Sequence, residues 1–111
     1  MAKQRSNEKT VYLISNGDFR DSSCVLGWPK QEETLREVKK AFAQLGVKTE
    51  VLTKYDAKRG HGFLTRQSEG ARFMANLDPE APIVVVLAIW AYAHHVSGPL
   101  QTHKGPILLL A

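Results

Sequence analysis

Apolar positions along the chain fall into short, dense runs separated by longer segments of mixed polarity. The runs, rich in β-branched and aliphatic residues, occupy 10–15, 83–89 and 105–111, and 47–53 alternates between apolar and polar positions, which also predicts a strand. A short and wholly apolar run is typical of a strand buried on both faces of a parallel sheet. Ile83-Val-Val-Val-Leu-Ala-Ile89 is the clearest example. We therefore predict that this run forms a central strand.

The segments between these strands carry helical periodicity. A first helix is predicted to begin near Pro29, because proline suits the first helical turn, and to end at Gly46. Its apolar stripe is predicted to consist of Leu35, Val38, Phe42 and Leu45. A second helix is predicted over 64–77 and a short third one over 96–103. The buried face of the second helix is predicted to consist of Phe73, Met74 and Leu77.

Strands that alternate with helices in this way are typical of a parallel sheet with right-handed crossovers. The predicted fold is therefore an α/β flavodoxin-like or Rossmann-like three-layer fold, with a parallel sheet of about four strands. Residues 1–9 are expected to form a flexible tail, and 10–111 a single domain. Because the chain ends inside its last apolar run, we expect this domain to be the N-terminal part of a longer multidomain protein.

Composition narrows the class of protein. The 111 residues suit one compact domain, and the net charge of +4 is spread among interspersed acidic residues, which argues against nucleic-acid binding. A single cysteine, Cys24, cannot form an internal disulfide, so a reducing compartment is favoured. The longest apolar stretch, 83–93, is shorter than the roughly 20 residues of a membrane span. We therefore expect a cytoplasmic protein that does not contact a membrane.

The first candidate site is the loop 16–23, which is rich in turn residues and follows the first strand. Ligands of open α/β sheets bind beyond the carboxyl ends of the strands. Arg20 offers a planar fork for an oxygen-rich ligand. The alternative is a surface turn in which Arg20 pairs with Asp18 or Asp21. The loop lacks both the G-x-G-x-x-G and the G-x-x-x-x-G-K-[ST] phosphate-binding patterns.

Two further loops carry candidate ligand contacts. His61 lies between Gly60 and Gly62, where it could touch an anion or a sugar hydroxyl, although a tight surface turn explains the glycines equally well. Trp90 and Tyr92 follow the Ile83 run, and each combines an apolar face with a hydrogen-bond donor, which suits a sugar. Aromatic packing against the end of the sheet is the alternative for these two residues.

Metal binding and nucleophilic catalysis find little support in the residue pattern. His94 and His95 are consecutive and would point in different directions on a helix, and His103 lacks cysteine or carboxylate partners at ligand spacing. Cys24 is not followed by an arginine in the C-x5-R spacing of low-molecular-weight phosphatases. Catalytic residues and metal ligands are therefore not expected within this chain.

Four motifs in order resemble the N-terminal domain of L-fucose isomerase-like proteins, in the L-fucose/L-arabinose isomerase superfamily. The motifs are Asn16-Gly-Asp-Phe-Arg-Asp21, Arg59-Gly-His-Gly-Phe63, Trp90-x-Tyr92-x-His94-His95 and Thr102-His103-x-Gly105-Pro-Ile-Leu108. The resemblance covers nearly the whole chain after the tail. It implies a flavodoxin-like domain that belongs to an aldose–ketose isomerase.

The resemblance also implies a division of labour within a longer enzyme. A divalent metal, typically Mn²⁺, holds two sugar oxygens while carboxylates move a proton, and its glutamate, aspartate and histidine ligands lie in later domains. The N-terminal domain contributes to a pocket that a neighbouring subunit of a homo-oligomer completes. Its arginine after the first strand and tryptophan after the third match Arg20 and Trp90. This chain alone is expected to be inactive.

Two other classes of function remain open from the sequence. The chain could be a non-enzymatic flavodoxin-like module that binds a sugar or a nucleotide. It could also be a purely structural oligomerisation domain, in which Arg20 and Trp90 affect assembly but not the Michaelis constant. The substrate-binding residues predicted under the isomerase interpretation are Arg20, His61, Trp90 and Tyr92.

Overall fold

The computed structural model describes residues 10–87 and 94–110. Strands and helices alternate along the chain, and all neighbouring strands are parallel, in the order β2-β1-β3-β4. The elements are β1 (Thr10–Ser15), α1 (Asp21–Gln44), β2 (Lys48–Val51), α2 (Gln67–Ala75), β3 (Ile83–Val86), α3 (His94–Thr102) and β4 (Ile107–Leu110). The predicted α/β fold with a four-stranded parallel sheet is confirmed.

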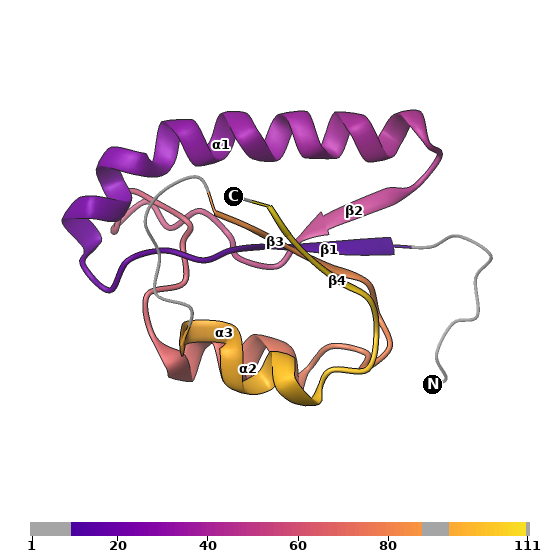
Figure 1. The fold of residues 1–111 in the computed structure, drawn as a ribbon. Helices are drawn as coiled ribbons and strands as arrows, with labels where there is room; N and C mark the ends of the chain where they lie inside the picture. The colour runs from indigo at the N-terminus through magenta and orange to yellow at the C-terminus, as the bar shows by residue number, and fades with distance from the viewer. Residues whose placement is uncertain (1–9, 88–93, 111) are drawn as a thin grey trace.

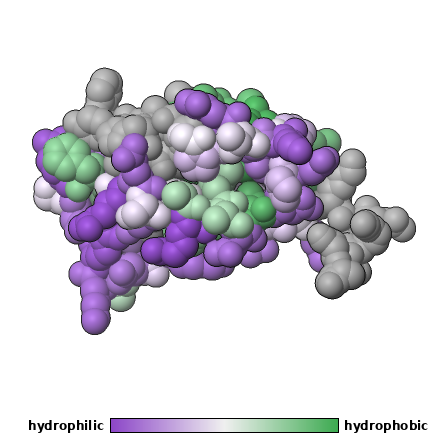
Figure 2. All heavy atoms as spheres, turned by 90° about the horizontal axis from the view of Figure 1, so that it is seen from below, coloured by the Kyte–Doolittle hydropathy of each residue, from purple (hydrophilic) through white to green (hydrophobic). Residues whose placement is uncertain are grey.

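The sheet is the middle of three layers (Figure 1). Helix α1 lies along one face, and α2 and α3 lie together on the other. The face that α2 and α3 present outward is mainly hydrophilic, with a small hydrophobic area near its middle (Figure 2). Among the helices in residues 10–87 and 94–110, none combines the length and apolar character needed to cross a membrane.

Two apolar clusters hold the layers together, one on each face of the sheet. Between the sheet and α1, Leu13, Val84 and Val86 contact the α1 residues Cys24, Trp28 and Leu35. On the opposite face, Ile14, Ile83, Val85, Leu64 and Met74 form the second cluster. All four residues of β3 are at most 3% exposed. The prediction that the Ile83 run is buried on both faces is therefore confirmed for the four residues of β3.

Helix α1 begins eight residues earlier than the predicted start at Pro29. It begins at Asp21, in the segment predicted to be a loop, and Pro29 lies inside it. Two buried side chains before the proline, Cys24 and Trp28, pack against the sheet. Their burial stabilises the two turns that precede Pro29, and this outweighs the hydrogen bond that proline cannot donate. The helix ends where predicted, because Gly46 adopts a left-handed φ of +75°.

Three other expectations need correction. Leu45 does not belong to the apolar stripe of α1, because it caps the helix and is 75% exposed. Helix α3 begins at His94, two residues before the predicted start, and includes Pro99. Strand β4 is not buried: Leu108 and Leu109 are 48% and 59% exposed, because β4 is an edge strand.

The sheet register fixes the edge from which the loops leave. Ser15 at the end of β1 pairs with Val86 at the end of β3, so both strands end at the same level. The chain after β1 and the chain after β3 therefore leave side by side. This carboxyl edge is where the sequence analysis places its candidate residues.

Candidate functional site

The loop after β1 and the loop before α2 are held together along the carboxyl edge of the sheet. The N–H of Leu64 donates to the carbonyl of Ser15 (2.8 Å), and the N–H of Gly17 donates to the carbonyl of Leu64 (3.0 Å). A Cβ atom on Gly17 would lie 2.8 Å from the Phe63 side chain, so only glycine permits this approach. These contacts bring the segment around His61 next to the start of α1.

Asp21, the first residue of α1, is the centre of a polar network at this edge. Its Oδ1 atom accepts hydrogen bonds from Arg59 Nη2 (2.8 Å), from Arg59 Nε (3.2 Å) and from His61 Nε2 (2.8 Å). The bond to Arg59, followed by the bond to His61, holds the pKa of Asp21 below its usual value of 3.8. The carboxylate is therefore ionised at neutral pH.

Arg59 joins Asp21 to a second carboxylate. Its Nη1 atom donates to Glu69 Oε2 (3.3 Å) and its Nη2 atom donates to Thr65 Oγ1 (2.6 Å). Glu69 Oε1 accepts the backbone N–H of Thr65 (3.0 Å), which ties the network to the start of α2. The bond to Asp21 raises the pKa of Arg59 above its usual value. We call these residues the Asp21 cluster: Asp21, Arg59, His61, Thr65 and Glu69.

His61 is buried, with 1% of its surface exposed, and both of its ring nitrogens have partners. Nδ1 accepts the backbone N–H of Phe63 (3.0 Å), so this nitrogen carries no proton. The proton of the neutral ring is therefore on Nε2, which donates it to Asp21. This arrangement makes His61 a positioning residue for the Asp21 carboxylate, and direct contact between His61 and a ligand stays a prediction.

Arg20 pairs with Asp18, as the surface-turn alternative expected. The Nε atom of Arg20 lies 3.0 Å from Asp18 Oδ2, and its backbone N–H donates to Asp18 Oδ1. The carboxyl group of Asp18 is 2% exposed, and the bond to Arg20 lowers its pKa. The Arg20 side chain remains 57% exposed. Arg20 is thus anchored at the carboxyl edge and still presents part of its guanidinium to solvent.

Two of the four predicted site residues, Arg20 and His61, lie in loops at this edge. His61 donates to Asp21, whereas Arg20, the residue before Asp21 in the chain, pairs with Asp18. Trp90 and Tyr92 lie outside the described residues. Sequence reasoning considered Asp21 only as a partner of Arg20 and assigned no role to Glu69. The repeated acidic residues of the loop, at 18 and 21, were the available signal for a carboxylate site.

The cluster does not fit a divalent cation. In residues 10–87 and 94–110, no group of three histidine, cysteine or carboxylate side chains is placed to hold a metal ion. Asp21 Oδ1 already accepts three hydrogen bonds, and both nitrogens of His61 are used. The cation beside the two carboxylates is Arg59 itself. No chemical step through a metal is derived from this cluster.

Cys24 packs inside the protein below the loop. It is fully buried, and its Sγ atom lies 3.3 Å from the carbonyl oxygen of Asp18, to which it donates. Burial raises the pKa of the Cys24 thiol. The thiolate required for nucleophilic attack is therefore disfavoured, and the residue acts as a small apolar side chain.

The Asp21 cluster can therefore hold one ionised carboxylate at a fixed place on the carboxyl edge, and the half-exposed side chain of Arg20 comes from the residue that precedes it. Comparison of the chain with protein-family models, with curated proteins and with solved structures finds no match.

Proposed function

We propose that this domain recognises a sugar at the carboxyl edge of its sheet. In this proposal it is the N-terminal substrate-recognition and assembly domain of a cytoplasmic, metal-dependent aldose–ketose isomerase of the L-fucose isomerase-like family. The four ordered motifs support the family, and the Asp21 cluster supports the site. The later domains of a longer parent protein supply the rest of the pocket, and a neighbouring subunit of a homo-oligomer borders it.

The observation that carries the proposal is the state of the Asp21 carboxylate. Its Oδ1 atom takes all the hydrogen bonds from Arg59 and His61, and Oδ2 has no partner in the part of the chain that the structure describes. The Asp21 side chain is 55% exposed. An ionised carboxylate with one oriented and accessible oxygen accepts strong hydrogen bonds from hydroxyl groups.

Arg20 complements this acceptor with donors. Its exposed guanidinium precedes Asp21 directly, and a guanidinium donates to the ring and hydroxyl oxygens of a sugar. A sugar hydroxyl can then donate to Asp21 while a neighbouring oxygen accepts from Arg20. Trp90 and Tyr92 are proposed to add an aromatic wall against the C–H face of the same sugar.

In this proposal, different domains of the parent protein contribute to the reaction in different ways. Mn²⁺, if later domains bind it, would supply the polarisation of the sugar oxygens. This chain's residues bind and orient the sugar: Asp21 fixes a hydroxyl, Arg59 and His61 keep Asp21 in place, and Arg20 fixes a neighbouring oxygen. No proton transfer is assigned to this chain. Its contribution is therefore expected in the Michaelis constant more than in the turnover number.

A direct test uses the parent protein with L-fucose, D-arabinose and related aldoses, with and without Mn²⁺. Asp21→Asn should raise KM by about 10- to 150-fold with a smaller change in kcat, because a hydrogen bond to a charged group contributes about 1.5–3 kcal/mol. Glu33→Gln is the matched control, since Glu33 pairs with Lys30 on the exposed side of α1. If the folded, metal-loaded parent isomerises no aldose, the proposal is wrong.

Trp90 gives a second, independent variant in the same assay. Trp90→Ala should weaken substrate binding by about 1–3 kcal/mol, the usual effect of losing a central aromatic contact. A normal KM in a folded Trp90→Ala protein that assembles differently would instead support a purely structural role for this loop.

One observation favours a second candidate function, a stand-alone binding module. Arg59 and His61 of this same chain orient the Asp21 carboxylate. A ligand that contacts this carboxylate therefore does not need another domain to position it. Calorimetry on this chain alone separates the two candidates: micromolar affinity for a sugar favours the module, because half of a shared pocket binds poorly.

A further inference from the structure

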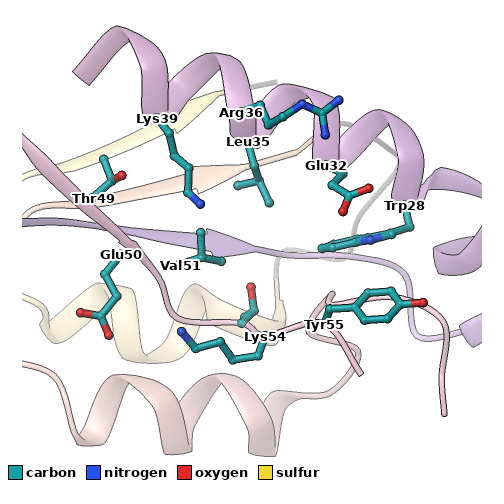
Figure 3. Close-up of a pocket in the computed structure, with 11 residues that line it drawn as sticks. Trp28, Glu32, Leu35, Arg36, Lys39, Thr49, Glu50, Val51, Lys54 and Tyr55 are labelled. Atoms are coloured by element: carbon teal, nitrogen blue, oxygen red, sulfur yellow. The ribbon is translucent and has the colours of Figure 1, made fainter. Parts of the chain in front are cut away.

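A groove lies between α1 and the edge strand β2, away from the Asp21 carboxylate. Its volume is about 580 Å³, within the range of about 300–1,000 Å³ that small-molecule sites occupy. Residues from α1 form one wall, and β2 with the segment that follows it forms the other (Figure 3). The lining includes two aromatic residues and three basic ones: Trp28, Tyr55, Arg36, Lys39 and Lys54.

One end of this groove is aromatic. Trp28 and Tyr55 lie with their ring centroids 5.9 Å apart and their planes tilted by 38°. Tyr55 is 56% exposed, so much of its side chain is available to a ligand. Trp28 is 8% exposed, yet its indole Nε1 donor has no hydrogen-bond acceptor among the described residues. Buried donors in proteins usually have an acceptor. The indole N–H of Trp28 lacks one among the described residues, so a ligand atom at this end of the groove could accept from it.

The rest of the groove carries three cations and two carboxylates among its lining residues. Arg36 and Lys39 come from α1 and Lys54 from the opposite wall, as the close-up shows (Figure 3). Within the described part of the chain, none of these three side chains forms an ion pair, and neither do the lining carboxylates Glu32 and Glu50. The lining therefore has an excess of one positive charge. Positive groups that the protein leaves unpaired favour an anionic ligand.

We propose that this groove binds a small aromatic anion, of the chemical class to which nucleoside monophosphates belong. The planar ring contacts Tyr55 at the aromatic end, where a ligand oxygen or ring nitrogen accepts the indole N–H of Trp28. The anionic group lies between Lys39 and Lys54, which face the groove from opposite walls. The groove shares no lining residue with the Asp21 cluster, and the two are joined through Trp28, which packs edge-on against Phe63 next to His61.

Calorimetric titration of the whole chain with adenosine monophosphate tests the proposal. We expect saturable binding, weaker binding of adenosine, and weaker binding of inorganic phosphate. The double variant Lys39→Gln/Lys54→Gln should lose about tenfold in affinity. Lys40→Gln, which removes a positive charge from α1 at a residue that does not line the groove, should bind as the unchanged chain does.

Fluorescence locates the ligand without relying on the lysine variants. In a Trp90→Phe protein, Trp28 is the one remaining tryptophan, and its emission should change with the same affinity that calorimetry measures. The proposal is overturned by the absence of saturable binding, by equal affinity for adenosine and adenosine monophosphate, or by equal losses in the double variant and in Lys40→Gln. If inorganic phosphate binds as tightly as adenosine monophosphate, the aromatic ring contributes nothing to binding, and the proposed aromatic anion is overturned. These binding experiments do not test the proposed sugar isomerisation by the parent, so the two proposals can fail separately.

Discussion

Tertiary contacts give one carboxylate, Asp21, a role that its place in the sequence does not show. In the sequence it is a turn residue beside Arg20, and in the structure it accepts hydrogen bonds from two side chains about 40 residues away. Arg59 and His61 fix the orientation of Asp21 Oδ1 and keep the carboxyl group ionised. At the scale of the residue, the candidate site is therefore a carboxylate that the protein positions and leaves partly accessible.

The lowered pKa of Asp21 predicts a pH-dependent contribution to stability. A carboxyl group whose pKa is lower in the folded protein stabilises the fold above its unfolded pKa, close to 3.8, and loses this contribution as the pH falls through the folded value. Urea unfolding should therefore show Asp21→Asn to be less stable at neutral pH, by at most about 1 kcal/mol because the side chain is half exposed. The difference should disappear in strong acid. A constant difference at every pH would contradict this origin.

At the scale of elements, one buried glutamine links helix α1 to the sheet. The Nε2 atom of Gln31 donates to Ser15 Oγ (2.9 Å) and to the carbonyl oxygen of Val86 (3.1 Å). Gln31 is fully buried, and its two acceptors lie at the ends of β1 and β3. It therefore fixes the position of α1 relative to the carboxyl edge on which the candidate site is built.

Replacement of this glutamine should destabilise the whole domain. Gln31→Leu keeps a similar volume but leaves Ser15 Oγ and the Val86 carbonyl without this donor, so the free energy of unfolding should fall by about 1–3 kcal/mol. Gln44→Leu, at the exposed end of α1, is the control and should change stability by less than about 0.5 kcal/mol. Equal stability of the two variants would show that Gln31 does not hold the helix in place.

At the scale of the whole molecule, the least ordinary surface is the edge strand β4. Ile107, Leu108 and Leu109 are 40–59% exposed, although four consecutive aliphatic residues are typical of a buried parallel strand. An exposed apolar edge also presents unpaired backbone groups, which favours pairing with another strand. The chain by itself therefore has a surface prone to self-association.

This surface predicts how the chain behaves in solution. The unchanged chain should associate as its concentration rises, and Leu109→Lys should shift it toward the monomer, because a charge on an edge strand opposes pairing. Leu26→Lys is the control, since Leu26 is 84% exposed and lies on α1, outside β4. Analytical ultracentrifugation measures both. A monomer at all concentrations, or an equal effect of the two lysines, would contradict a role for β4.

The sequence by itself determined the order of the elements, the parallel sheet, the buried β3 strand and the end of α1 at Gly46. These features depend on local periodicity and on the φ preference of single residues, which neighbouring positions in the chain encode. The sequence also indicated that Arg20 and His61 lie at the carboxyl edge, because the α/β pattern places their loops there, and their contact with a ligand stays a prediction.

Only the tertiary structure decided the remaining features. The early start of α1 depends on the burial of Cys24 and Trp28 against strands elsewhere in the chain. The exposure of β4 depends on its place at the edge of the sheet. The contact of His61 with Asp21 depends on which loops meet there. In each case the interaction joins residues distant in sequence, and strand order and register, which local patterns do not encode, determine whether they meet.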